Sequence, residues 1–154
     1  MNNRIIIPLV NSSCKLPMII FELGGEKKLA LIDTGSESTL LDQHTSTNES
    51  FVLEETNYVM SLVGLSGETS KKRIVGARAR LSICDDSNNY REVSVEGMLT
   101  DLSHVSEGIG ARFGNELKVA AIIGSDFLKE NDGIIDYGSN QLSILGKDMI
   151  VKSE

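Results

Sequence analysis

The residue types best suited to chemistry follow a short apolar run. Residues 29–32 are all apolar and predict a buried strand, and Asp33, Thr34, Gly35 and Ser36 come directly after it. An ionised carboxylate at such a strand end loses hydration, so an acid is an unusual choice there. Gly35 permits a tight turn and a close approach of another backbone. The hydroxyls of Thr34 and Ser36 can fix the turn or donate to a carboxylate. An ordinary turn built on the Asp33 side chain explains the same four residues.

Three further features favour a catalytic interpretation. A glycine-tipped hairpin is predicted around residues 63–67, an apolar strand ends at Gly124 before a short helix, and residues 133–137 follow that helix. In this order, and together with Asp33-Thr34-Gly35-Ser36, these features resemble the retropepsin-like aspartic proteases. The resemblance runs from about residue 16 to residue 145. Members of this family are single-domain relatives of pepsin that work as homodimers.

The resemblance implies a role for each matching residue. Asp33 matches the catalytic aspartate, and Thr34 matches the residue whose hydroxyl locks the two active-site loops across the dimer axis. Gly35 matches the glycine that lets the substrate approach, Ser36 supports the same loop, and Gly124 matches the end of the strand beneath it. The tip of the flap that closes over a bound peptide is matched by Gly64, Leu65, Ser66 and Gly67. The chain departs from the compact viral members in its long polar segment 42–55 and its long segment 99–117.

The implied activity is hydrolysis of peptide bonds by an aspartic endopeptidase. Two close carboxylates sharing one proton can activate a water molecule and polarise the substrate carbonyl. The chain has one Asp-Thr-Gly, so symmetry would supply the second carboxylate, Asp33 of a partner chain. The expected assembly is a homodimer acting on a peptide or protein substrate, without metal or other cofactor. The alternatives are a catalytically silent dimeric peptide-binding or scaffolding domain of the same fold, and a non-enzymatic β-barrel interaction module.

Other candidate groups are weaker. Residues 134–139 repeat the pattern of residues 31–36, so Asp136 could pair with Asp33 within one chain, but Tyr137 is too large for the threonine position. We expect Asp136 to be a structural acid at a strand end. His44 and His104 lie in polar stretches without paired ligands, which predicts surface histidines and no zinc site. The two cysteines, Cys14 and Cys84, show no metal-ligand spacing and are expected to be reduced and buried.

The elements that must position these residues are short strands between turn signals. Strands are predicted at residues 16–23, 28–32, 58–63, 72–75, 79–84, 91–96, 118–123, 134–137 and 141–145. Residues 99–117 contain Gly108, Gly110 and Gly114 and predict a loop, so residues 126–131 form the single expected helix, near the C-terminus. Short strands at regular spacing with little helix favour an all-β closed barrel. The apolar segments 5–7 and 149–151 are candidates for strand pairing between two chains.

Composition limits the remaining classes of function. The chain has 154 residues, which fits one domain covering residues 1–154, and 15 basic against 22 acidic residues give a net charge of −7. No stretch is basic enough to follow a phosphate backbone, so nucleic acid is an unsuitable partner. No segment has the roughly 18 consecutive apolar residues of a membrane span, and the first residues do not form a signal peptide. We therefore expect a cytoplasmic protein that does not bind membranes.

Overall fold

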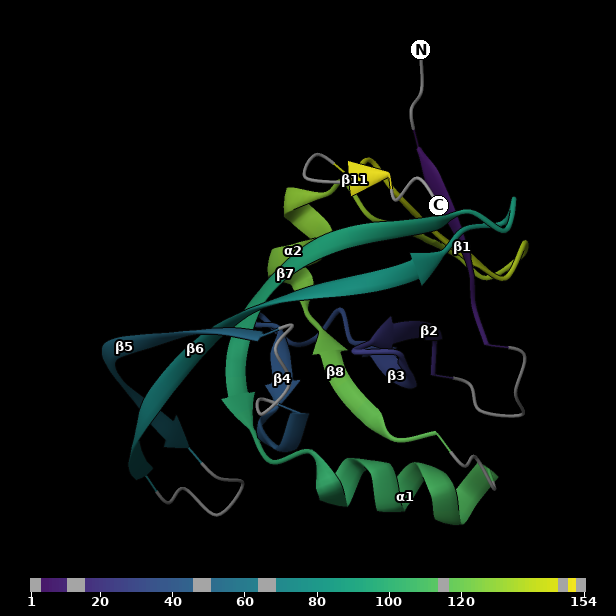
Figure 1. Cartoon of the computed structure of the whole chain (residues 1–154). Coiled ribbons are helices and arrows are strands. Elements are labelled where there is room, and N and C mark those ends of the chain that lie inside the picture. Colours follow the sequence, from purple (N-terminus) through teal and green to yellow (C-terminus); the bar gives the residue numbers. More distant parts are fainter. Residues whose placement is uncertain are drawn as a thin grey trace.

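The computed structural model describes residues 4–10, 16–45, 51–63, 69–113, 117–146 and 150–151, and its main feature is a closed β-barrel (Figure 1). Six strands pair in the ring order β7-β4-β8-β3-β2-β6, and β6 pairs with β7 to close it. The ring strands are β2 (Met18–Leu23), β3 (Glu26–Ile32), β4 (Leu40–Asp42), β6 (Thr69–Cys84), β7 (Tyr90–Thr100) and β8 (Val119–Ile123). The predicted all-β barrel is therefore confirmed.

The barrel forms where the apolar runs of the sequence can be buried on both faces. Residues 29–32 at the end of β3 are all buried, and β3 lies between antiparallel β2 and parallel β8. A strand with a neighbour on each side and both faces covered is typically a continuous apolar run rather than an alternating one. The strand that leads to Asp33 is thus among the most enclosed in the barrel.

A smaller sheet packs beside the barrel. It has the order β1-β10-β9 and contains β1 (Ile5–Pro8), β9 (Ile134–Asp136) and β10 (Gln141–Ile144), all antiparallel. Ile5, Ile7, Leu142 and Ile144 join the main hydrophobic core. β1 pairs with β10 of its own chain and lies at the edge of this sheet, so the expected pairing of residues 5–7 between chains stays a prediction. The same holds for β11 (Ile150–Val151), which pairs with β7.

Two α-helices flank the barrel, where the sequence predicted only one. The expected helix is α2 (Ser125–Glu130), which follows β8, and a 3-10 turn, η1 (Gln43–Thr45), follows β4. The additional helix α1 (Ser103–Phe113) occupies most of the segment predicted as a loop and lies near the start of β8 (Figure 1). Gly108 and Gly110 lower the intrinsic helix propensity of this segment. Ile109 nevertheless packs into a second core cluster against β3 and β8, and this burial outweighs the propensity.

The long hairpin of β5 (Phe51–Val63) and β6 extends beyond the ring of the barrel (Figure 1). Its strands pair antiparallel from Phe51 opposite Ala79 to Val63 opposite Thr69, with one irregularity between Glu55 and Val59. The sequence predicted two separate strands at 72–75 and 79–84, whereas β6 runs through both without a break. No helix in the described part of the chain is both long and apolar enough to cross a membrane.

Candidate functional site

Asp33 lies at the point where β3 leaves the barrel. Its backbone amide donates to the carbonyl oxygen of Ile123 at 2.9 Å, and the preceding amide of Ile32 donates to Pro17 at 2.9 Å. The backbone leading to Asp33 is therefore held by strands on both sides. Asp33, Thr34 and Gly35 are all exposed. A rigid barrel strand thus presents an acid, a hydroxyl and a glycine at the surface.

The turn after β3 is held by short-range hydrogen bonds. The amide of Gly35 donates to Oδ1 of Asp33 at 3.0 Å, and the amide of Ser36 donates to the Asp33 carbonyl at 3.1 Å. A Cβ on Gly35 would lie 3.3 Å from Asp33 Oδ1, which explains why glycine suits this position. Within the described residues, no group is hydrogen-bonded to Oδ2 of Asp33 or to the hydroxyl of Thr34. These two groups are available to a substrate or to a second chain.

Ser36 supports the loop through its backbone and hydroxyl. Its Oγ donates to the carbonyl of Ser38 at 2.7 Å, and its own carbonyl accepts from the amide of Ser125 at 2.7 Å. The sequence left open whether this hydroxyl fixes the turn or bonds a carboxylate. The structure assigns it to the loop backbone, not to the carboxylate of Asp33.

Gly124 ends β8 directly beneath this loop. A Cβ at this position would lie 2.7 Å from the carbonyl oxygen of Ser36 and 2.8 Å from the carbonyl of Ser38. Because these are backbone atoms, they cannot move without displacing the loop that follows Asp33. Glycine is therefore required by a close approach of two backbones. The role that the resemblance implies for Gly124 stays a prediction.

Two residues that the sequence did not assign to the site complete its support. Thr39 is fully buried at the far end of the loop, and its amide and hydroxyl both donate to the carboxylate of Asp126 in the first turn of α2. The expected helix began at residue 126, and no residue elsewhere in the sequence was assigned as a partner of Asp126. The two residues are 87 positions apart, so no local pattern could have paired them.

The proposed flap tip falls outside the described part of the chain. Gly64, Leu65, Ser66 and Gly67 were matched to this tip, and the structure describes the hairpin only up to Val63 and from Thr69 onward. The existence of the hairpin is confirmed. The roles of the four tip residues remain predictions, and Cys14 likewise lies outside the described residues.

Asp136 occupies a turn of the smaller sheet. Its Oδ1 accepts from the amide of Ser139 at 3.1 Å. Hydrogen bonds from Ser139, through its amide and its hydroxyl, lower the pKa of Asp136 below its ordinary range. The carboxylate is thus engaged in stabilising its own turn at the end of β9, which agrees with its interpretation as a structural acid.

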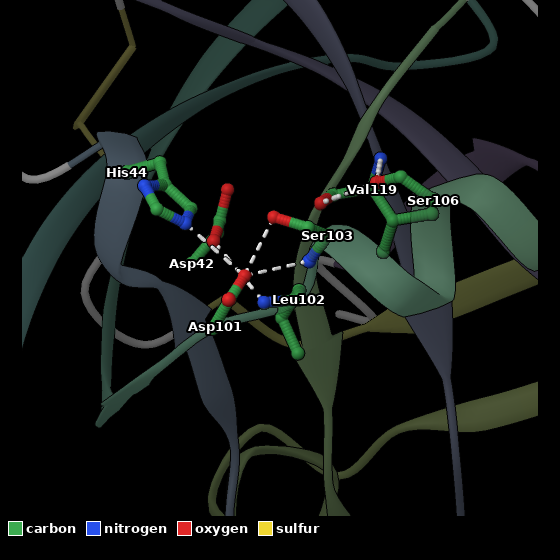
Figure 2. Close-up of polar contacts among 7 residues, drawn as sticks. All are labelled: Asp42, His44, Asp101, Leu102, Ser103, Ser106 and Val119. Atoms are coloured by element: carbon green, nitrogen blue, oxygen red, sulfur yellow. Dashed lines mark hydrogen bonds and ion pairs between the residues drawn. The ribbon is translucent and has the colours of Figure 1, made fainter.

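A second polar cluster lies at the start of α1 (Figure 2). Asp42, His44 and Asp101 bring their donor atoms within 4.8 Å of one another, the arrangement most suited to a metal ion among the described residues. Oδ1 of Asp101 accepts from His44 Nε2 at 3.1 Å and from the amide and hydroxyl of Ser103. Asp42 accepts from the amide of Leu102 at 3.2 Å.

These contacts satisfy backbone amides at the first turn of α1, which otherwise have no partner inside the helix. The hydrogen bonds from Ser103, with a smaller contribution from His44, lower the pKa of Asp101 to about 2. His44 was expected to lie at the surface without paired groups. It is exposed, but it has the partner Asp101, which sequence spacing did not reveal. The cluster is accounted for as the N-terminal cap of α1.

Comparisons with known proteins identify the fold. Neither the family models nor the curated proteins compared with this sequence match it. Among solved structures, the retroviral protease-like domain of Ddi1 from Leishmania major aligns over 92% of this chain and 96% of its own length, with 12% identity and a TM-score of 0.50. A retropepsin-like aspartic protease from Rickettsia conorii aligns over 92% and 89%, with 16% identity and a TM-score of 0.49. The alignment with the Ddi1 domain shows that this chain has a retropepsin-like fold.

Proposed function

We propose that the protein is an aspartic endopeptidase whose active site forms between two copies of the chain, with one Asp33 from each. The observation that carries this proposal is that Asp33 has a fixed backbone and an exposed carboxylate. Its backbone is fixed by β2 and β8, whereas its carboxylate, the Thr34 hydroxyl and Gly35 lie exposed beside each other. The acid, the hydroxyl residue and the glycine are thus all accessible to a substrate or to a second chain.

The chemistry follows from pairing two such carboxylates. Like charges about 3 Å apart cannot both ionise, so the pair holds one proton between them. The ionised Asp33 takes a proton from water as the oxygen attacks the peptide carbonyl carbon. The protonated Asp33 donates to the carbonyl oxygen, which gives a tetrahedral diol. The Asp33 that took the proton from water then gives it to the leaving nitrogen as the C–N bond breaks, and the other Asp33 takes a proton back from a diol hydroxyl as the product carboxyl group forms. The free Oδ2 of Asp33 and the unpaired hydroxyl of Thr34, among the described residues, support a role at a subunit contact.

Asp33→Asn tests the proposal, with Asp136→Asn as the matched control. Both changes replace one acid by its amide at a strand end, but only Asp33 is assigned to the reaction. Hydrolysis of a peptide library, followed by mass spectrometry, should be lost in Asp33→Asn and unchanged in Asp136→Asn. Sedimentation should find a dimer in both proteins.

Each other outcome has a definite meaning. Full peptidase activity in Asp33→Asn would refute the assignment of the catalytic residue. An active monomer, with activity lost in Asp136→Asn, would replace the symmetric pair by a pair within one chain. A dimer that binds peptides and does not cleave them would refute the enzyme and identify a peptide-binding domain of the same fold.

A further inference from the structure

We infer that Asp126 and Thr39 form a positioning pair that sets the placement of the Asp33 carboxylate, an inference that rests on the proposed function. Thr39 is buried, and the side-chain hydrogen bonds of the pair go to the loop end and to residues 124–127, not to Asp33. The two residues act through the loop of residues 33–39, which begins at Asp33 and ends at Thr39. The argument depends on how many separate contacts join this loop to one short segment, residues 123–126.

Thr39 is buried with every polar group occupied. Its amide donates to Oδ2 of Asp126 at 3.0 Å, and its hydroxyl donates to Oδ1 at 2.7 Å. The same hydroxyl accepts from the amide of Gly124 at 3.1 Å. Its carbonyl accepts from the amide of Met98 in β7 at 3.0 Å. This one residue therefore joins the loop to α2, to the end of β8 and to β7.

Asp126 is oriented for this contact by its own helix. Its Oδ1 also accepts from the amide of Phe127 at 2.8 Å, so the carboxylate makes three hydrogen bonds at two oxygens. Phe127, next along α2, is buried in the main core and anchors the helix to the barrel. A carboxylate is suited to this position because both of its oxygens accept and neither has to donate.

The segment 123–126 holds the catalytic loop at three points. Ile123 accepts from the amide of Asp33 at the start of the loop, and Ser125 donates to Ser36 in its middle. Gly124 and Asp126 hold Thr39 at its end. If the side-chain contacts of Thr39 are lost, this end of the loop is held only through backbone groups, such as the Thr39 carbonyl that accepts from Met98, and the loop can shift there. The Asp126–Thr39 contact removes this freedom.

The consequence for catalysis is one of geometry rather than of substrate binding. Misplacement of a reacting group by about 1 Å can cost about 100-fold in rate. Thr39 and Asp126 act on the end of the loop and are not assigned to substrate contact, so loss of the pair should lower kcat and leave KM nearly unchanged. A pair that merely held the fold together would lower the fraction of active protein in proportion to the loss of stability.

Thr39→Val is the main test because it removes the hydroxyl and keeps the shape of the side chain. We expect kcat to fall about 10- to 100-fold with KM within about twofold of wild type. Thr39→Ser restores the hydroxyl and should recover kcat to within about threefold of wild type, since both hydrogen bonds can form again. Asp126→Asn keeps the size of the side chain but turns one acceptor into a donor, so its kcat should lie between those of Thr39→Ser and Thr39→Val.

Ser106→Ala is the matched control. The Ser106 hydroxyl also joins a helix to the barrel, because it accepts from the amide of Val119 at 2.9 Å and donates to the Val119 carbonyl (Figure 2). Its loss should lower thermal stability to a similar degree as Thr39→Val. Since it has no contact with the loop 33–39, kcat per folded protein should stay at the wild-type value.

Amide hydrogen exchange gives a readout that does not depend on activity. The amide of Gly124 should exchange faster in Thr39→Val than in wild type or Thr39→Ser, because its acceptor is the Thr39 hydroxyl. If Thr39→Val does not fold, the same measurements on Asp126→Asn decide the question. An active wild type with unchanged kcat in the folded variants, or an equal loss of kcat in Ser106→Ala, would overturn the inference. An inactive wild type would instead refute the proposed function, and the inference with it.

Discussion

Gly124→Ala and Gly108→Ala are the same chemical change, and the structure predicts opposite effects on stability. At Gly124 a new Cβ would lie 2.7 to 2.8 Å from three backbone atoms of Ser36 and Ser38. Real Cβ atoms essentially never lie closer than 3.0 Å to such an atom. The backbone at Gly124, with φ −94° and ψ −178°, is one that alanine adopts freely, so the contacts alone impose the cost. At Gly108 in α1 a Cβ would meet nothing within 4 Å.

The expected magnitudes follow from these distances. Forcing an extra methyl group into a packed site costs about 1–3 kcal/mol, and each kcal/mol lowers Tm by about 2–4 °C in a domain of this size. Gly124→Ala should therefore lower Tm by about 2–12 °C. Replacing a helix-interior glycine by alanine gains about 0.5–1 kcal/mol, so Gly108→Ala should raise Tm by about 1–4 °C.

Differential scanning calorimetry together with steady-state peptide hydrolysis tests this prediction. In Gly124→Ala, kcat should fall by more than the loss of folded protein explains, because the atoms that must shift belong to the loop after Asp33. Gly108→Ala should keep the wild-type kcat. A Gly124→Ala protein with wild-type Tm and kcat would refute the close approach of β8 to this loop.

Three further predictions concern the turns and the assembly. Gly25 has φ +83° and open space around its Cβ position, so Gly25→Ala should cost about 1–2 kcal/mol of unfolding free energy from backbone strain alone, and a urea midpoint equal to wild type would contradict this. Burial alone would raise the pKa of Asp85, but hydrogen bonds from Arg91 and two backbone amides outweigh it and hold this pKa below 3.8. Asp85→Asn should therefore cost about 1.5–3 kcal/mol at pH 7. In wild type this stabilisation is complete above pH 3.8 and is lost as pH falls through the lower pKa of Asp85 in the folded state. The unfolding free energies of wild type and Asp85→Asn should therefore converge at low pH. A difference between them that does not change with pH would disprove this. Because each chain supplies one Asp33, specific activity should fall on dilution below the dimer dissociation constant, and activity proportional to concentration throughout would rule out a shared site.

The sequence by itself determined the barrel class and the local features of the site. The apolar run at 29–32 is typical of an enclosed strand, and an acid, a hydroxyl residue and a glycine directly after it favour a turn. The glycine pair at 24–25 lies between the predicted strands 16–23 and 28–32, and both glycines adopt the positive φ that the tight turn of a hairpin requires. These features depend on residues that are adjacent in the sequence, so they can be predicted from the sequence pattern.

Only the tertiary structure decided the features that depend on distant residues. Helix α1 forms because Ile109 is buried against β3 and β8, which offsets the low helix propensity of Gly108 and Gly110. His44 meets Asp101 across 57 positions, and Thr39 meets Asp126 across 87. Strands β1 and β11 find partners within their own chain, although their sequences are equally suited to pairing between chains. A hydrogen bond or apolar contact stabilises a segment only when the fold brings both partners together, and the sequence pattern around either partner does not contain that information.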